Sequence, residues 1–292
     1  MPRNYRPGLD VVRLAALLPV LCYHYCIEAA RLGFAVPTAL IGRGMADWVE
    51  IGLAWFFLLS GAALCLQWQG RFDARRYFVG RAAATYPAFW LGFGALFLYG
   101  EVLHGNNADI PRWRVVFSVL GLDGYLAPVT VTFYKIGEWF LGVILILYLV
   151  FPLLAPLCAK WPLPTLAALG LVQLGYTCWL LPQYGSGDYS ARFNQLPAFS
   201  GVLAVGVAAA WVFAKFAHGG WAQHVLPRAG CTALGLAALI WLDAEMRAQA
   251  AAAEYQQFQL INRMPLVLAA AAVLVCFGLG LTLPGVLRRA LR

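Results

Sequence analysis

The feature that most constrains this chain is an apolar run near its N-terminus, at residues 11–29. A helix of about 20 mostly apolar residues is long enough to cross the hydrocarbon core of a bilayer. The run contains the ionisable side chains Arg13, near its start, and His24, well inside it. On an α-helix, residues at this separation differ by about 20° around the axis and by about 16 Å along it. The run therefore predicts a membrane helix with one polar face that extends from a membrane surface past the midplane.

The composition of the whole chain also indicates a membrane protein. Hydrophobic residues make up 62% of the 292 residues and charged residues only 12%, about half the charged fraction of a typical soluble domain. The apolar runs are continuous rather than alternating, which favours helices over a β-barrel. The first run is too long for a cleavable signal peptide and lacks an A-x-A site. We predict an all-α integral membrane protein that forms a single domain over residues 1–292.

Eight apolar segments are predicted as transmembrane helices. They lie at residues 11–29, 48–68, 83–103, 138–157, 165–181, 196–216, 229–242 and 264–283. A basic stretch at residues 71–81 is predicted as a loop that enters the third span. Residues 104–135 contain Gly121, Gly124 and Pro128, which break long helices, so this stretch is predicted as a partly embedded loop. The even number of spans places both termini on one side of the membrane.

The distribution of Lys and Arg predicts which side that is. The net charge is +8. In a multispanning protein, such an excess usually reports topology and contact with anionic headgroups, so no nucleic-acid partner is expected. On the side of both termini lie 13 of the 21 basic residues and on the other side eight, with most of the difference at residues 71–81. The positive-inside rule then predicts cytoplasmic termini and an outer position for residues 183–195.

The seven cysteines are scattered, and nearly all of them lie within apolar runs. No C-x-x-C motif and no paired Cys and His spacing is present, so we expect small buried residues rather than disulfides or metal ligands. Neither a metal nor a bound cofactor is predicted.

His24 and Arg13 each allow a functional and a structural interpretation. An ionisable residue within a membrane helix is by default a functional candidate, and histidine readily moves a proton near neutral pH. The alternative is that His24 hydrogen-bonds a neighbouring helix and fixes the packing. Arg13 alone could be an anchor whose side chain reaches the membrane surface. On one face with His24, however, it suits a phosphate-bearing donor.

The basic cluster at residues 71–81 has two interpretations as well. It is either a topology determinant or a docking patch for the phosphates of a nucleotide-linked substrate such as coenzyme A. Spacing alone does not separate the two.

Four motifs, in order along the chain, resemble those of the acyltransferase-3 type of membrane O-acyltransferases. Leu-Asp at residues 9–10 introduces the span that carries Arg13 and His24. FFLLSG at residues 56–61 is similar to the FF-x-L-S-G of that family. The two further motifs are YFVGR at 77–81 followed by YPAFW at 86–90, and WFL at 139–141 followed by LYLVFPLL at 147–154.

The resemblance implies transfer of an acyl group, commonly acetyl from acetyl-CoA, onto a hydroxyl of a glycan, a lipid-linked sugar or another cell-envelope acceptor. The acyl-CoA is then a donor substrate and not a resident cofactor, and the bacterial inner membrane is the expected location. His24 is implied as the catalytic histidine. The remaining implied site residues are the donor-binding Arg13, Arg81 and Arg76 and the supporting Glu138, Trp139 and Ser60.

The sequence departs from the family pattern in three places. The second arginine of an R-x-x-R pattern falls on Ala84, and a glutamate five residues after the tryptophan of W-x-L falls on Ile144. Family members often have ten spans, so two are expected to be missing here.

Two rival functions stay open. The first is a transporter or flippase, with a path lined by Arg13, His24, Glu28 and Glu50. The second is a catalytically inactive relative that serves as a partner subunit.

Overall fold

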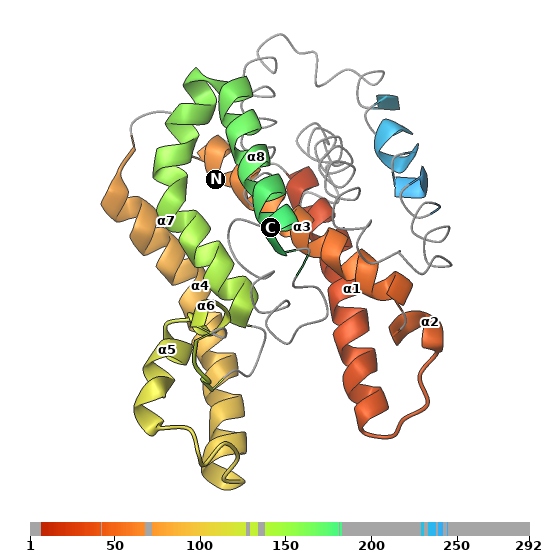
Figure 1. Ribbon diagram of the computed structural model, residues 1–292, viewed down its shortest axis with the longest axis vertical. Coiled ribbons are helices and arrows are strands. Elements are labelled where there is room, and N and C mark those ends of the chain that lie inside the picture. The colour runs from red at the N-terminus through yellow and green to blue at the C-terminus, as the bar shows by residue number, and fades with distance from the viewer. Residues whose placement is uncertain are drawn as a thin grey trace. The chain divides into compact units, whose positions relative to one another are not determined.

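The computed structural model describes residues 7–41, 43–67, 72–126, 129–133, 138–180 and 182, and short pieces at 229–230, 233–237, 239–241 and 244 (Figure 1). Within these residues the chain is helical and contains no strand. Four of the described helices are long and apolar enough to cross a membrane: Leu9–Arg31, Ala74–Leu103, Trp139–Leu157 and Leu163–Leu180. For the described residues, the prediction of an all-helical protein with membrane-length helices is confirmed.

The count of eight spans stays a prediction. The first, third, fourth and fifth predicted spans each coincide with one of the four membrane-length helices. The second corresponds to a helix whose apolar part, Ile51–Leu64, is shorter. The described pieces between 229 and 241 are helical, as the seventh span requires. The sixth and eighth predicted spans lie outside the described residues.

Contacts divide the chain into two compact units. The first contains α1 (Pro7–Arg31), α2 (Thr38–Ile41) and α3 (Arg43–Gln67). The second contains α4 (Ala74–Phe97), the π-helical turn η1 (Leu98–Leu103), η2 (Arg112–Arg114), α5 (Val115–Val119), α6 (Asp123–Leu126) and most of α7 (Glu138–Lys160). α8 (Pro162–Leu180), like α7, has residues in both units. A single domain over the whole chain stays a prediction.

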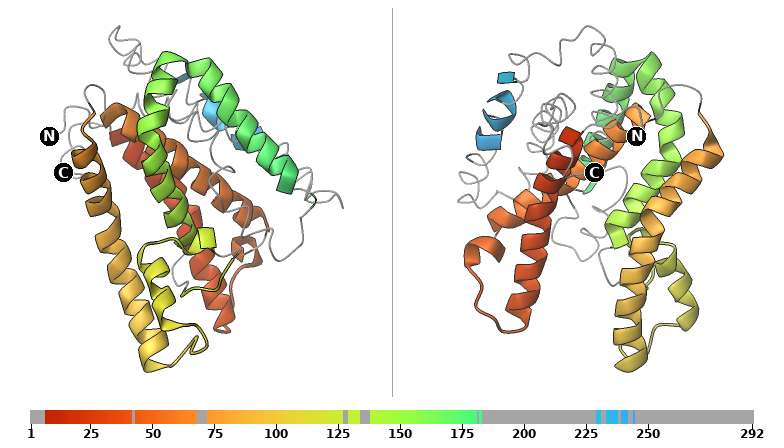
Figure 2. Two further views of the ribbon diagram at one scale, coloured as in Figure 1. Left: turned by 60° about the vertical axis from the view of Figure 1, so that its left-hand side comes forward. Right: turned by 180° about the vertical axis from the view of Figure 1, so that it is seen from behind.

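In the first unit, α1 packs along α3 (Figures 1 and 2). The two backbones approach closely, because a Cβ atom built on Gly52 would lie 2.6 Å from the carbonyl oxygen of Ala16. Small residues at such a contact are typical of helix pairs in membranes. α1 continues through Pro19 without a break, which membrane helices tolerate when neighbouring groups satisfy the freed carbonyl. The predicted first span is therefore one continuous helix.

In the second unit, α4 and α7 lie side by side and antiparallel (Figures 1 and 2). The fully buried Tyr77 of α4 joins them. Its hydroxyl donates a hydrogen bond of 3.0 Å to the backbone oxygen of Tyr148, and its ring stacks on Phe151 with a centroid distance of 5.8 Å. These contacts fix which residues of the two helices face each other.

The start of α4 corrects one sequence prediction, because residues 74–81 are helical and do not form a loop. Asp73 is the N-cap, and its Oδ1 accepts a hydrogen bond of 3.0 Å from the backbone N–H of Arg76. Aspartate is among the best N-cap residues, and the alanine and arginine residues that follow are strong helix formers. The basic residues from Arg75 to Arg81 therefore occupy the first two turns of α4.

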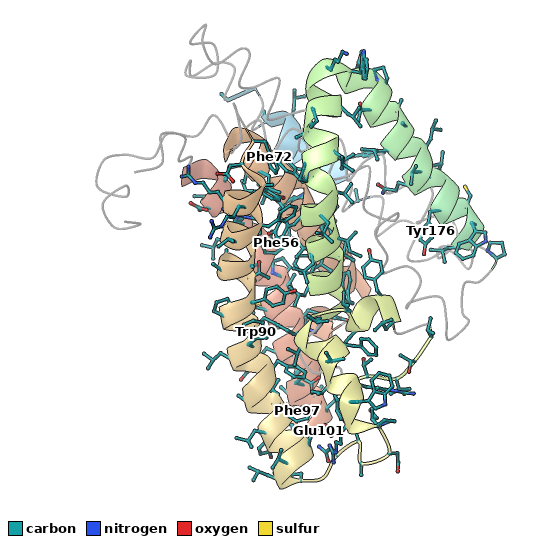
Figure 3. The ribbon with its side chains drawn as sticks, turned by 90° about the vertical axis from the view of Figure 1, so that its left-hand side faces the viewer. Phe56, Phe72, Trp90, Phe97, Glu101 and Tyr176 are labelled. Carbon is teal, nitrogen blue, oxygen red and sulfur yellow. The ribbon has the colours of Figure 1, made fainter. Side chains whose placement is uncertain are left out.

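The segment after η1 folds back along α4. The indole Nε1–H of Trp90 donates to the backbone oxygen of Val119 at 2.9 Å, and the Tyr86 hydroxyl donates to that of Leu120 at 3.1 Å. Figure 3 shows Trp90 on α4, which continues into η1 with the labelled Glu101. The short helices α5 and α6 are separated at Gly121, whose φ is +73°. The predicted break at this glycine is thus confirmed.

Candidate functional site

The candidate catalytic histidine and the first candidate donor arginine share one helix. Val12 and Ala16 belong to the buried side of α1. On an ideal helix, Arg13 and His24 lie about 60° and 80° from Ala16, in the same direction. Both polar side chains therefore lie at the edge of the face that packs on α3, as the helical periodicity predicted.

His24 is exposed, and its ring meets the ring of Tyr23 edge to face at a centroid distance of 5.6 Å. Within the described residues, the imidazole makes no hydrogen bond to another side chain or to the backbone. The imidazole is therefore not used as a packing bond between the helices described here. Its catalytic role stays a prediction.

Arg13 forms an ion pair within the first turns of α1. Its Nη1 lies 2.7 Å from Oδ1 of Asp10, and the two side chains are 40% and 39% exposed. The aspartate of the Leu-Asp motif thus orients the arginine three residues further on. A guanidinium has five N–H donors, so one contact to Asp10 does not exhaust its capacity to bind an anion.

Arg81 and Arg76 point from different sides of α4. The Cζ of Arg81 lies 5.7 Å from the centroid of the Tyr148 ring, on the side that α4 turns towards α7. Arg76 is exposed and lies about 140° around the helix from Arg81. The structure therefore does not bring the predicted donor arginines of α4 onto one face.

The supporting candidates have structural contacts of their own. Ser60 Oγ donates a hydrogen bond of 2.7 Å to the backbone oxygen of Phe56, a common arrangement for serine inside a helix. Glu138 is the first residue of α7, and its side chain lies outside the described set. Trp139 sits against Gly124, where an added Cβ would lie 2.2 Å from the tryptophan Cα. These contacts neither require nor exclude a catalytic role.

The candidates are distributed over both units. Those of the first unit are His24, Arg13 and Ser60, and those of the second are Arg76, Arg81, Glu138 and Trp139. A site that joins residues of the two units stays a prediction.

The structure also describes two positions that depart from the family pattern and one residue of the alternative transport path. Ala84 is exposed on α4, whereas Ile144 is buried on α7. Glu28, a candidate for a transport path, pairs with Arg31 at 2.7 Å, and both side chains are well exposed. The side chain of Glu50 lies outside the described residues.

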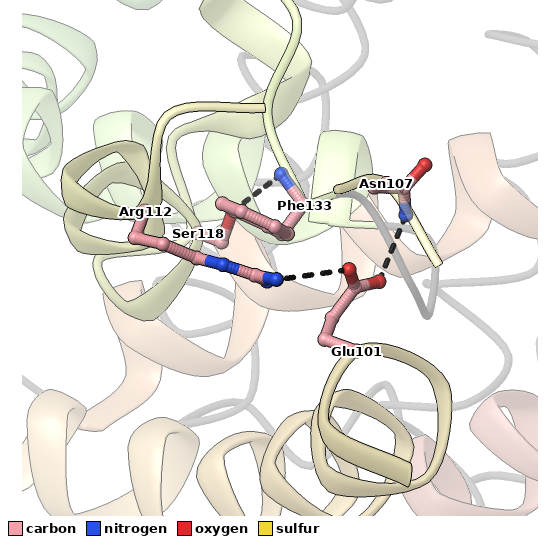
Figure 4. Close-up of polar contacts among 5 residues, drawn as sticks. All are labelled: Glu101, Asn107, Arg112, Ser118 and Phe133. Carbon is pink, nitrogen blue, oxygen red and sulfur yellow. Dashed lines mark hydrogen bonds and ion pairs between the residues drawn. The ribbon is translucent and has the colours of Figure 1, made fainter. Parts of the chain in front are cut away.

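Sequence analysis missed a buried carboxylate at the end of α4. Glu101 is 3% exposed and lies in the π-helical turn. Its Oε1 accepts a hydrogen bond of 2.8 Å from Nδ2 of Asn107, and its Oε2 lies 3.8 Å from Nη1 of Arg112 (Figure 4). The sequence signal for this residue is an acidic side chain inside an apolar span, the same signal that marks His24 as a functional candidate.

A second missed pair lies in the folded-back segment. Ser118 Oγ donates a hydrogen bond of 2.6 Å to Oδ1 of Asp123. The same oxygen accepts a hydrogen bond of 3.1 Å from the backbone N–H of Phe133 (Figure 4). Asp123 is 1% exposed. Through these hydrogen bonds, the pair ties α5, α6 and Phe133 together. Within the described ranges, no three His, Cys, Asp or Glu side chains gather as a metal-binding group.

The membrane-length helices define an integral membrane protein, and the sequence comparison specifies its family. The sequence model of the acyltransferase-3 family, described as an acyltransferase domain, matches residues 6–289. The match spans nearly the whole chain, so the chain belongs to this family. Neither the curated proteins nor the solved structures yield a match to it. Family membership supports a membrane acyltransferase in general terms.

Proposed function

We propose that the protein transfers an acyl group, in the first instance acetyl, from acyl-CoA to a hydroxyl of a cell-envelope glycan or lipid-linked sugar. One observation carries the proposal. In a member of the acyltransferase-3 family, a continuous membrane-length helix holds Arg13 and His24 on the same edge of its packed face. An arginine can bind a donor phosphate, and a histidine can move the proton of an acceptor.

In the proposed reaction, His24 first accepts a proton from the acceptor hydroxyl and then gives a proton to the leaving thiolate. The neutral imidazole accepts the hydroxyl proton while the acceptor oxygen forms a bond to the thioester carbonyl carbon. The carbon–sulfur bond then breaks, and the imidazolium returns the proton to the coenzyme A thiolate. The products are an ester and free coenzyme A, and the histidine ends as it began.

The donor is assigned to Arg13 and Arg81, with Arg76 in an outer role because it is exposed on another side of α4. Coenzyme A is made in the cytoplasm, and many envelope acceptors lie beyond the inner membrane. A polar edge about 16 Å long on α1 supports contact between the two substrates across part of the bilayer. The bacterial inner membrane is the location that this chemistry needs.

Transfer of label from acetyl-CoA by the purified protein in lipid nanodiscs tests the proposal. Label in the acetyl group should move to an acceptor hydroxyl, with release of one coenzyme A thiol for each acetyl moved. Label in the adenosine part should stay with coenzyme A. Passage of intact donor or acceptor across a vesicle membrane without thiol release would instead support a transporter. Absence of both would fit an inactive partner subunit.

A further inference from the structure

The contact between α4 and α7 places Arg81 beside an aromatic ring of α7. Its guanidinium carbon lies 5.7 Å from the centroid of the Tyr148 ring. Tyr148 is the central residue of Trp139–Leu157, the most apolar of the four membrane-length helices. The guanidinium thus lies beside an apolar stretch of α7, whereas the sequence predicts a loop at Arg81. A charge beside such an apolar stretch needs a specific partner.

The aromatic partner of Arg81 is itself fixed in place. Tyr77 precedes Arg81 by one helical turn, so the two side chains leave α4 on the same side. The Tyr77 hydroxyl donates to the backbone oxygen of Tyr148 at 3.0 Å, and the Tyr77 ring stacks on Phe151, one turn further along α7. The register that Tyr77 sets therefore keeps the Tyr148 ring beside Arg81.

We propose that Tyr148 is a positioning residue for the donor, which holds the Arg81 guanidinium by a cation–π contact within the apolar layer. This inference rests on the proposed function, because it takes Arg81 as a ligand of the acyl-CoA phosphates. A cation–π contact uses none of the five N–H donors of the guanidinium, and it is strongest where water is excluded. The ring thus orients the arginine without competing with phosphate for hydrogen bonds.

Acetyl-CoA binding to the full chain in lipid nanodiscs tests the role of the ring. Replacement Tyr148→Leu should raise the Kd and the donor KM about 5- to 30-fold, the usual worth of a desolvated cation–π contact, with kcat nearly unchanged. Replacement Tyr148→Phe keeps the aromatic face and should stay within about twofold of the wild type. The matched control is Leu149→Ala, an exposed residue next to Tyr148 on another side of α7, which should leave the Kd unchanged.

A double-mutant cycle shows whether Tyr148 acts through Arg81. In an Arg81→Ala background, Tyr148→Leu should cause no further rise in Kd. An equal rise in both backgrounds, an unchanged Kd in Tyr148→Leu, or a loss in Tyr148→Phe as large as in Tyr148→Leu would overturn the inference. Where Tyr148→Leu does not fold, Tyr148→Met replaces it with the same expected rise. Wild-type protein that does not bind acetyl-CoA would contradict the proposed function as well, whereas the other outcomes concern Tyr148 alone.

Discussion

Asp10 and Arg13 illustrate how a charged residue is accommodated at the start of a membrane-length helix. The pair is about half exposed, with an N–O distance of 2.7 Å, so its contribution to stability is modest. Asp10 also lies in the first turn of α1, where the helix dipole favours a negative charge. The pair lowers the net charge near the membrane surface and keeps the arginine oriented.

Replacement of Arg81 by alanine should weaken donor binding more than it slows the chemical step. A charge-assisted hydrogen bond to phosphate is worth about 1.5–3 kcal/mol, or about 10- to 150-fold in donor KM. Lysine should restore only part of the affinity, because it lacks the planar fork of the guanidinium. Steady-state kinetics with varied acetyl-CoA measure the effect.

The matched control for Arg81 is Arg75→Ala, an exposed arginine of the same helix. Its donor KM should remain close to the wild-type value. A donor KM that is unchanged in Arg81→Ala would remove this residue from the donor site and leave it a topology signal.

At the level of helices, the contact of α1 with α3 is sensitive to one methyl group. A Cβ on Gly52 would lie 2.6 Å from the carbonyl oxygen of Ala16, so Gly52→Ala forces the helices apart. Overpacking of this kind costs about 1–3 kcal/mol. The midpoint of thermal unfolding in nanodiscs should fall accordingly. Gly94→Ala is the control, because nothing lies within 4 Å of a Cβ there, and it should not lower the midpoint.

The buried carboxylate of Glu101 should stabilise the segment that follows α4. Glu101→Ala removes the acceptor of the Asn107 amide and the partner of Arg112. Loss of a partner for a buried hydrogen-bonding group costs about 1–3 kcal/mol. Thermal unfolding should report a lower midpoint for Glu101→Ala than for Asp109→Ala, which removes an exposed acidic residue of the same segment. Equal midpoints would contradict this role.

The helices were predictable to the extent that local sequence determines them. α1, α7 and α8 follow from continuous apolar runs, and the shared edge of Arg13 and His24 follows from the helical period. The start of α4 differs from the predicted loop, because Asp73 caps the helix and the arginine residues that follow continue it. Local signals thus locate a helix better than its polar ends.

The contacts around the candidate site were less predictable. Tyr77 and Tyr148 are 71 residues apart in the chain, and no local pattern indicates that they meet. The pairing of Glu101 with Asn107 and Arg112 also depends on a turn in which Asn107 has a φ of +53°. Tertiary packing decides such contacts, so single-sequence reasoning reaches the candidate residues but not their partners.

For the whole molecule, we predict that both termini and the start of α4 are on the cytoplasmic side and residues 183–195 on the outer side. The prediction rests on the excess of Lys and Arg residues on the side of the two termini. Single cysteines in a cysteine-free background report the topology in intact cells. A cysteine at Ser186 should react with an impermeant thiol reagent, whereas one at Ala74, which is exposed at the start of α4, should not. Reaction at position 74 would reverse the orientation.

The most direct test of the central claim is acetyl transfer by His24→Gln, compared with the wild type and His24→Ala. A general base contributes about 10²–10⁴-fold, so both variants should lose that much in kcat/KM. They should also lose the rise with pH that a histidine base gives the wild type. Both should fold, because interhelical hydrogen bonds in membranes average about 0.6 kcal/mol. If His24→Gln keeps wild-type transfer while His24→Ala aggregates, the histidine is a packing residue and the catalytic assignment is wrong.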